Sequence, residues 1–271
     1  MHKIPTFSND EIFARLFKNK SNYWNYIREL RKRKSKDIYE KVIKLTTSID
    51  NNKKVIGINI LAQFGYPRNH KKQILKTYFN LLKSESNLKV ISSILYGIGH
   101  NNEGLTENQI DLICRFQTSR SATIRYSLTF ALLGVKNKNA INTLIKLSRD
   151  KASDIRNWAT FGIGSQTEAD NIEIRDALWE RVTDIDKNTR DEAIAGLAIR
   201  KDRRVKEILK KELDVADTFS SLTLEAIEHF NDKEFIELIE QKIHKNKTEQ
   251  TVNEDWLKTI LNTLKTNKND R

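Results

Sequence analysis

The sequence predicts an all-α protein built as an α-solenoid of about six helix pairs, with further helices capping both ends. Only 2 prolines and 9 glycines interrupt the 271 residues, which disfavours a turn-rich β protein. Apolar residues recur three and four positions apart along the chain, the spacing of amphipathic helices. Similar helical segments also return at a nearly constant interval, as expected for a stack of repeated units.

In chain order, two helices expected at 10–18 and 23–34 form a basic N-terminal cap, residues 1–35. A repeat array is expected over residues 36–245, in which each unit consists of a first helix (helix A), a short turn and a second helix (helix B). Helices expected at 233–244 and 254–264 close the array, and residues 246–271 are expected to hold a capping helix and a polar tail.

The six A helices are expected in the segments D-I-Y-E-K-V-I-K-L, K-K-Q-I-L-K-T-Y-F-N-L-L, N-Q-I-D-L-I-C-R-F, A-I-N-T-L-I-K-L, E-I-R-D-A-L-W-E-R-V and R-V-K-E-I-L-K-K-E-L. Each B helix is anchored on its first apolar residue, and successive anchors lie 34, 34, 31, 34 and 33 residues apart; they are Ile56, Val90, Ile124, Ile155, Thr189 and Leu222. Positions 0, 4 and 8 from each anchor point together on a helix, so we expect them to form the core facing helix A.

Two B-helix regions carry the same motif, D-K-A-S-D-I-R-N-W-A-T-F-G-I-G at Asp150–Gly164 and D-I-D-K-N-T-R-D-E-A-I-A-G at Asp184–Gly196. They resemble HEAT repeats, in particular the short HEAT-like subtype of the phycobilin lyases, and the resemblance extends over residues 36–245. It implies a right-handed, armadillo-like α-solenoid of about six HEAT-like helix pairs with helical caps. In such repeats an aspartate of the A–B turn bonds to the helix B region and an arginine forms a ladder between units. The resemblance implies this structural role for Arg125, Asp150, Arg156, Asp184 and Arg190.

Positions 2 and 6 of each B helix point away from helix A, toward the expected inner, concave face. Large aromatic residues recur there in successive copies, and a tryptophan stands at position 3 of one copy. Exposed apolar residues on one side of a solenoid are typical of a binding surface. The alternative is that these rings fill gaps between neighbouring B helices. We expect partner binding at Tyr96, Tyr126, Phe130, Trp158 and Phe161.

Positive charge is concentrated at the start of the chain, whose net charge is +12. Residues 1–90 contain 20 lysines and arginines against 7 acidic residues, whereas residues 91–271 contain 28 against 29. This asymmetry would attract an acidic partner or nucleic acid, although a solvated helical face is an equal alternative. The candidate contacts are Arg28, Arg31, Lys32, Arg33 and Lys34.

The sequence contains no recognisable catalytic or metal-binding motif. The 5 histidines are not spaced as metal ligands, and one cysteine, Cys114, cannot form a zinc pair. No Gly-rich nucleotide motif or nucleophile elbow occurs. We therefore predict no catalytic residue, no metal and no cofactor, and we favour a protein without enzymatic activity.

The chain is expected in the cytoplasm. It lacks an apolar signal core at its start and any run of about 18 apolar residues, which disfavours export and a membrane location. A lone cysteine fits a reducing compartment.

The favoured function is a HEAT-repeat scaffold that binds a protein or peptide on its concave face. The main alternative is a nucleic-acid-binding solenoid, and a resemblance to HEAT-like alkylpurine DNA glycosylases extends this alternative to base excision. That family carries an aspartate one helical turn after a tryptophan, and the corresponding residues here are Arg28, Gly162, Thr183 and Ile260. A phycobilin-lyase-type protein is the weakest alternative.

Overall fold

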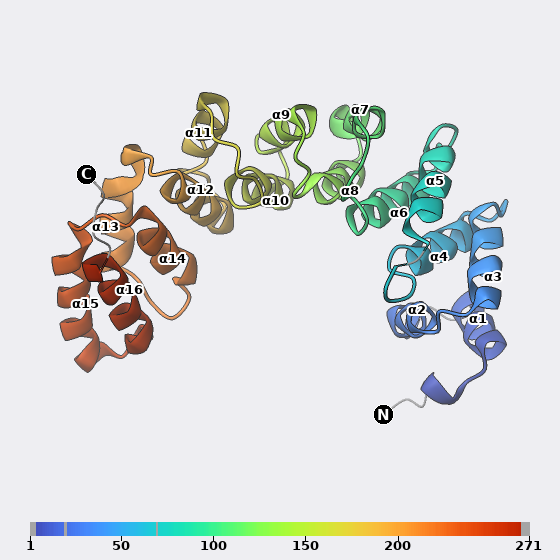
Figure 1. Ribbon diagram of the computed structural model, residues 1–271, viewed down its shortest axis with the longest axis horizontal. Helices are drawn as coiled ribbons and strands as arrows, with labels where there is room; N and C mark the ends of the chain where they lie inside the picture. Colours follow the sequence, from blue (N-terminus) through green and yellow to red (C-terminus); the bar gives the residue numbers. More distant parts are fainter. Residues whose placement is uncertain (1–3, 19–20, 69, 267–271) are drawn as a thin grey trace. The chain divides into compact units, whose positions relative to one another are not determined.

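The computed structural model describes residues 4–18, 21–68 and 70–266 (Figure 1). This part of the chain is all-α, with α-helices, three short 3-10 helices and no strand. Residues 267–271, the end of the segment 246–271 in which a capping helix and a polar tail are predicted, lie outside the described residues. Contacts divide the chain into two compact units, Met1–Ala140 (unit 1) and Ile141–Arg271 (unit 2).

The helices follow the predicted order closely. Unit 1 contains η1 (Ile4–Thr6), α1 (Asn9–Lys18), α2 (Tyr23–Lys32), α3 (Lys36–Thr46), α4 (Asn51–Leu61), α5 (Lys71–Leu82), α6 (Leu88–Gly99), α7 (Glu107–Cys114), η2 (Arg115–Thr118) and α8 (Ala122–Leu132). The helix α9 (Lys138–Leu147) includes the division between the units. Unit 2 continues with α10 (Ser153–Gly164), α11 (Ile172–Trp179), α12 (Lys187–Ile199), η3 (Arg203–Val205), α13 (Lys206–Asp214), α14 (Ser221–Phe230), α15 (Phe235–Glu249) and α16 (Glu254–Thr266).

Several helices begin where a polar side chain accepts a hydrogen bond from a backbone N–H group of the first turn. Asp50 caps α4 through the N–H of Asn52 at 2.8 Å, and Asp186 caps α12 through the N–H of Thr189 at 2.8 Å. Thr106 forms a reciprocal capping box at the start of α7. Each such cap stabilises its helix by about 1 kcal/mol, which accounts for well-defined helix starts despite short turns.

Each unit has its B helices in one layer and its A helices against them (Figure 1). In unit 1, α2, α4, α6 and α8 pack in succession, with α3 against α4 and α5 against α6. In unit 2, α10, α12, α14 and α16 pack in succession, with α11 against α12 and α13 against α14. The α10–α12 contact is close at two glycines, because a Cβ atom added at Gly196 would lie 2.7 Å from the Cα atom of Gly164.

The predicted core is confirmed with one exception. Positions 0, 4 and 8 of the first five B helices are all buried, from Ile56 to Leu197. In the sixth copy the anchor is wrong, because Leu222 is half-buried while Thr223 and Leu224 are buried. Ala226 and Phe230, the other two predicted inward residues of α14, are buried as expected.

Arginines near the start of three B helices bond to the preceding turn. The Nη1 groups of Arg125, Arg156 and Arg190 donate to the backbone carbonyls of Ser119, Asp150 and Asp184 at 2.7, 3.0 and 2.6 Å. Arg156 also forms two hydrogen bonds with the carboxylate of Asp184, at 2.8 and 2.7 Å, and this ion pair is largely buried. In unit 2 the guanidinium of Arg156 thus connects α10 to the turn before α12.

A buried arginine closes the other end of the same two helices. Arg200 is 7% exposed. Its guanidinium donates to the carbonyl of Ile163 at 2.8 Å, of Gly164 at 2.7 Å and of Gly196 at 2.9 Å. It also bonds to the loop after α10, through the carbonyls of residues 167 and 169. Carbonyls of the last helical turn lack intrahelical partners, so Arg200 satisfies groups that burial would otherwise leave unpaired.

Candidate functional site

The candidate site is the side of the B helices that carries positions 2, 3 and 6, which we call the B-helix face and describe separately for each unit. On unit 1, three aromatic rings meet on α6 and α8. The ring of Tyr96 lies 6.3 Å from that of Tyr126 and 5.5 Å from that of Phe130. All three side chains are half-buried. They therefore offer both contact with each other and area to a partner.

Phe130 also packs onto the neighbouring B helix. A Cβ atom at Gly99 would lie 2.5 Å from the Phe130 ring, so only glycine at this position lets the ring settle on α6. Part of the ring thus fills the space between two B helices, as the alternative interpretation of the aromatic row predicts.

On unit 2, the indole of Trp158 and the ring of Phe161 are in edge-to-face contact, with centroids 5.7 Å apart. Trp158 is 37% exposed, a high value for the largest apolar side chain, and Phe161 is half-buried. A tryptophan that remains partly in water while its neighbour Ala159 is fully buried marks an accessible apolar spot on α10.

Several other residues at positions 2 and 6 of the B helices are buried. Ile58, Ala62, Ser92 and Ala195 are all at most 7% exposed. The hydroxyls of Ser92 and Ser127 bond across α6 and α8 at 2.6 Å. At positions 2 and 6, adjacent B helices approach closely enough to bury these four side chains between them, whereas the rings of Tyr96, Tyr126, Phe130 and Phe161 stay half-buried.

Two of the five basic candidates are tied into the N-terminal helices. Arg33 pairs with Glu29 at 2.8 Å and donates to the carbonyl of Phe7 at 2.7 Å. Arg31 donates twice to the carbonyl of Asn59, at 3.0 and 2.7 Å, in the last turn of α4. Both guanidinium groups therefore hold helices and loops of unit 1 together.

The other basic candidates surround a hollow between α2 and the end of α4. This cationic pocket has a volume of about 370 Å³, and its lining consists of Arg28, Arg31, Lys32, Lys34, Gln63, Gly65 and Tyr66. Tyr66 is 87% exposed. The backbone N–H of Gly65 donates to the carbonyl of Arg31 at 2.9 Å, which fixes the loop after α4 against α2.

A chain of contacts joins the cationic pocket to the aromatic rings of unit 1. The Nη1 group of Arg31 donates to Gln63 at 2.9 Å, and the amide nitrogen of Gln63 lies 2.9 Å from Nδ1 of His100. The imidazole of His100 in turn meets the Phe130 ring at 5.1 Å. Gln63 and His100 therefore connect the cationic pocket to the aromatic residues of α6 and α8.

His100 in this chain is uncharged at neutral pH. Burial lowers the pKa of its imidazole to about 4, and the positive charges of Arg31 and Arg68 act in the same direction. The face thus changes from cationic at α2 to neutral and aromatic at α6 and α8.

The corresponding face of unit 2 carries acidic groups. Burial, together with the carboxylates of Asp191 and Glu225, raises the pKa of Glu192 to about 7. The Oε2 atom of Glu192 and the Oδ1 atom of Asn157 are buried acceptors without a hydrogen-bond donor in the described structure. Polar groups in this state favour a partner that brings N–H or O–H donors.

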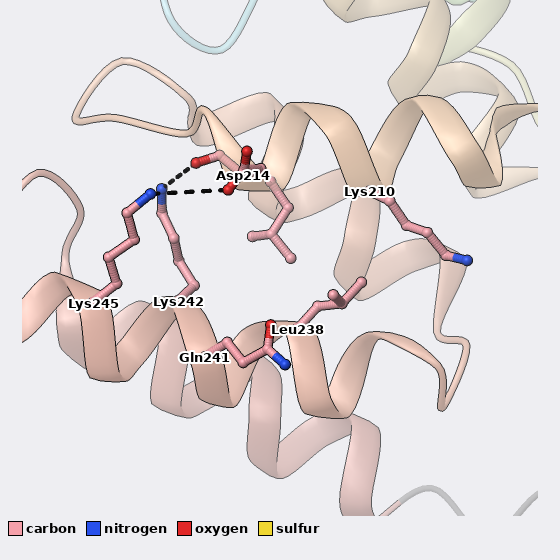
Figure 2. A pocket seen from close by; sticks show the side chains of 7 residues that line it. Lys210, Asp214, Leu238, Gln241, Lys242 and Lys245 are labelled. Atoms are coloured by element: carbon pink, nitrogen blue, oxygen red, sulfur yellow. Dashed lines mark hydrogen bonds and ion pairs between the residues drawn. The ribbon is translucent and has the colours of Figure 1, made fainter.

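A smaller pocket of about 130 Å³ between α13 and α15 is lined by three lysines but does not form a ligand site (Figure 2). The Nζ group of Lys242, a residue 6% exposed, donates to the carbonyl of Asp214 at 2.8 Å. Lys245 lies 3.9 Å from the carboxylate of Asp214, and Lys210 points away on the opposite side. Lys242 and Lys245 thus both contact Asp214 at the end of α13, whereas Lys210 pairs with Glu207 and Glu234, so the three ammonium groups do not face one common site.

The described residues contain no group of three or more His, Cys, Asp or Glu side chains arranged as metal ligands. Cys114 is buried at 2% exposure in α7. Among the helices of the described ranges, none combines the length and apolar character needed to cross a bilayer.

Sequence reasoning missed three members of the site in unit 1: Tyr66, Gln63 and His100. Tyr66 lies in the loop after α4, where no repeat position is defined. Gln63 and His100 belong to different repeats, so their contact depends on how α4 packs against α6. The one feature of the sequence that pointed to this site was His100 itself, which directly follows the glycine that ends α6.

Comparisons with known proteins agree with the fold. No protein-family model matches the chain. Protein YibA of Escherichia coli K12 is 34% identical over 126 residues, 46% of this chain and 44% of YibA, and YibA of strain O157:H7 matches equally. The chain's match thus spans less than half the length of these curated relatives.

The crystal structure of E. coli YibA matches with a TM-score of 0.79 at 24% identity, over 97% of this chain and 94% of that chain. An engineered protein matches with a TM-score of 0.57 at 16% identity, covering 94% of this chain and 78% of its own. A second one has a TM-score of 0.52 at 19% identity, covering 71% and 94%. The chain therefore has an all-helical, repeat-like fold similar to that of YibA.

Proposed function

We propose that the chain is a HEAT-like α-solenoid scaffold without enzymatic activity that binds a protein partner on the B-helix face. The layered packing of A and B helices within each unit supports the repeat architecture. The arginine contacts of Arg125, Arg156 and Arg190 support the HEAT-like type, because they recur at the same place in successive repeats.

Trp158 is the observation that carries the binding function. An indole 37% exposed and braced edge-to-face by Phe161 is held in one place, so it would lose little side-chain entropy on binding. Tryptophan is enriched among the residues that dominate binding energy at protein interfaces. Tyr96, Tyr126 and Phe130 would supply further apolar area on unit 1.

The test is a double substitution, Trp158→Ala with Phe130→Ala, in affinity capture from cell lysate followed by mass spectrometry. Each anchor is expected to contribute about 2 kcal/mol, or roughly thirtyfold in affinity. A protein captured by the native chain should therefore be lost from the double variant, while far-UV circular dichroism remains unchanged.

A matched control replaces two apolar residues outside the face, Ile172→Ala and Ile185→Ala. These side chains are 62% and 92% exposed, so they remove similar apolar surface without touching the rings. The control should capture the same partner as the native chain. Equal capture by the native chain and the Trp158/Phe130 variant would refute the proposal.

The cationic pocket favours nucleic-acid binding as a second candidate function. Within the described residues, Arg28, Arg31, Lys32 and Lys34 form no ion pair with a carboxylate. The side chains of Arg28, Arg31 and Lys34 bond to carbonyl or amide oxygens instead. If several phosphates are bound, the affinity for a single-stranded oligonucleotide should fall steeply as salt rises. An affinity independent of salt would remove this candidate.

A further inference from the structure

We propose that the groove between α2 and α4 binds an acidic segment of the protein partner that also carries an apolar side chain. This inference rests on the proposed scaffold function and specifies the chemistry of its partner. It combines the cationic pocket with a second hollow beside it.

The second hollow is apolar and has a volume of about 450 Å³. It lies among α1, α2 and α4, and its lining consists of Leu16, Phe17, Lys18, Tyr23, Trp24, Asn52, Val55, Ile56 and Asn59. Trp24 is 55% exposed and Phe17 is 41% exposed, so two large apolar side chains remain in water at this place. The rings of Tyr23 and Trp24 are in edge-to-face contact at 5.2 Å, which restrains the exposed indole.

The two hollows follow each other along the same pair of helices. On α2, Trp24 lines the apolar hollow and Arg28, one turn later, lines the cationic pocket. On α4 and its continuation, Asn59 lines the first and Gln63, one turn later, lines the second. The guanidinium of Arg31 lies between them, because it bonds to the carbonyl of Asn59 and to the side chain of Gln63.

The described residues of unit 1 do not neutralise the positive charge of the pocket. Nearby basic residues have acidic partners, such as Lys41 with Asp10 at 2.6 Å and Arg33 with Glu29 at 2.8 Å. The pocket cations bond to uncharged oxygens: Lys34 to the carbonyl of Tyr66 at 2.9 Å, and Arg28 to that of Trp24 at 3.2 Å. Arg31 uses three of its five N–H groups on such oxygens, so two are left for a ligand.

An acidic peptide fits this arrangement better than a nucleic acid. Backbone recognition of a nucleic acid requires cations spread along a track and rings that are free to stack on bases. Here four cations gather around one pocket. The next residues of the face, His100 and Phe130, are neutral, and the Phe130 ring is packed on Gly99. A carboxylate beside an apolar side chain matches a cationic pocket one helical turn from an apolar hollow.

The experiment measures binding of a fluorescein-labelled peptide, Glu-Glu-Phe-Glu-Glu-Phe, to the full chain by fluorescence polarisation. Its lysine counterpart and a single-stranded oligonucleotide of equal length serve as comparison probes. The acidic peptide should bind, with affinity that falls as salt is added, and the lysine peptide should not.

The decisive variant reverses two charges of the pocket, Arg28→Glu with Lys32→Glu, which lie one turn apart on α2. A matched control, Lys72→Glu with Lys76→Glu, reverses two exposed charges one turn apart on α5 and changes the net charge equally. The pocket variant should weaken peptide binding at least about tenfold, whereas the control should change it less than about twofold. Trp24→Ala should lower the affinity for this peptide but not for a hexaglutamate peptide.

Three results of the peptide assay would overturn the inference: no binding of the acidic peptide, an equal loss in both double variants, or tighter binding of the oligonucleotide that depends on the same pocket. The outcome is separable from that of the proposed function. If the pocket variant still captures the partner that the Trp158/Phe130 variant loses, the scaffold function stands and the acidic-segment inference falls.

Discussion

Replacing Arg200 by methionine should strongly destabilise unit 2. Methionine keeps most of the unbranched stem but removes the guanidinium, so the carbonyls of Ile163, Gly164 and Gly196 lose their donor in a buried place. Each unpaired buried carbonyl costs roughly 1–3 kcal/mol, although water entering beside the loop after α10 would recover part of this. We expect a loss of about 3–5 kcal/mol in the free energy of unfolding.

The assay is urea-induced unfolding followed by far-UV circular dichroism, with hydrogen exchange to locate the change. Amides near the ends of α10 and α12 should lose protection first, because Arg200 joins these two ends. Arg203→Met is the matched control, since that arginine is exposed and its loss should change the stability by less than about 0.5 kcal/mol. If Arg200→Met and Arg203→Met unfold at the same urea concentration, carbonyl pairing by Arg200 does not stabilise the chain.

Three further predictions concern stability. Glu192→Gln should raise stability at pH 8 by about 1 kcal/mol after allowance for solvent screening. The pKa of Glu192 is raised to about 7 in the native chain, so the native state holds this proton more tightly than the unfolded state does. The resulting contribution to stability is complete below pH 4.5 and is lost as pH rises through 7. A pH-independent difference from the native chain in thermal unfolding would contradict this. The pH dependence from His100 has the opposite sign. Its pKa of about 4 makes its contribution to stability complete above pH 6.5, and this contribution is lost as pH falls toward 4. His100→Gln should therefore reduce the loss of stability at acid pH in the same thermal unfolding assay. Gly196→Ala should cost about 1–3 kcal/mol in urea unfolding, because its Cβ would meet backbone at Gly164, and an unchanged midpoint would show that α10 and α12 can separate freely.

The helical segments and most of the core follow from local pattern. Spacing of apolar residues identified every B helix and the inward positions of five of them, because a helix with one apolar stripe must bury it whatever its neighbours are. The sixth helix departed from the pattern only at Leu222, which is half-buried, whereas Ala226 and Phe230 are buried as predicted.

The candidate site could be predicted only in part. Trp158 was identifiable because it stands at a position where the other copies have polar residues, and the structure leaves it partly exposed. The burial of Ala62 and Ser92 was not predictable, because it depends on the distance between adjacent B helices. The same applies to Arg31 and Arg33, which are equal to Arg28 in sequence but differ in the carbonyls within their reach.

The sequence by itself determined the helices, their periodic return and the concentration of positive charge before residue 91, since these depend on composition and on the 3.6-residue period alone. Tertiary structure decided which basic side chains bond to carbonyls at helix ends and which line a pocket. It also placed His100 between that pocket and the Phe130 ring. The physical reason is that a side chain's partners lie about one repeat away in sequence, and only the packing of neighbouring helices sets which of them come within hydrogen-bonding distance.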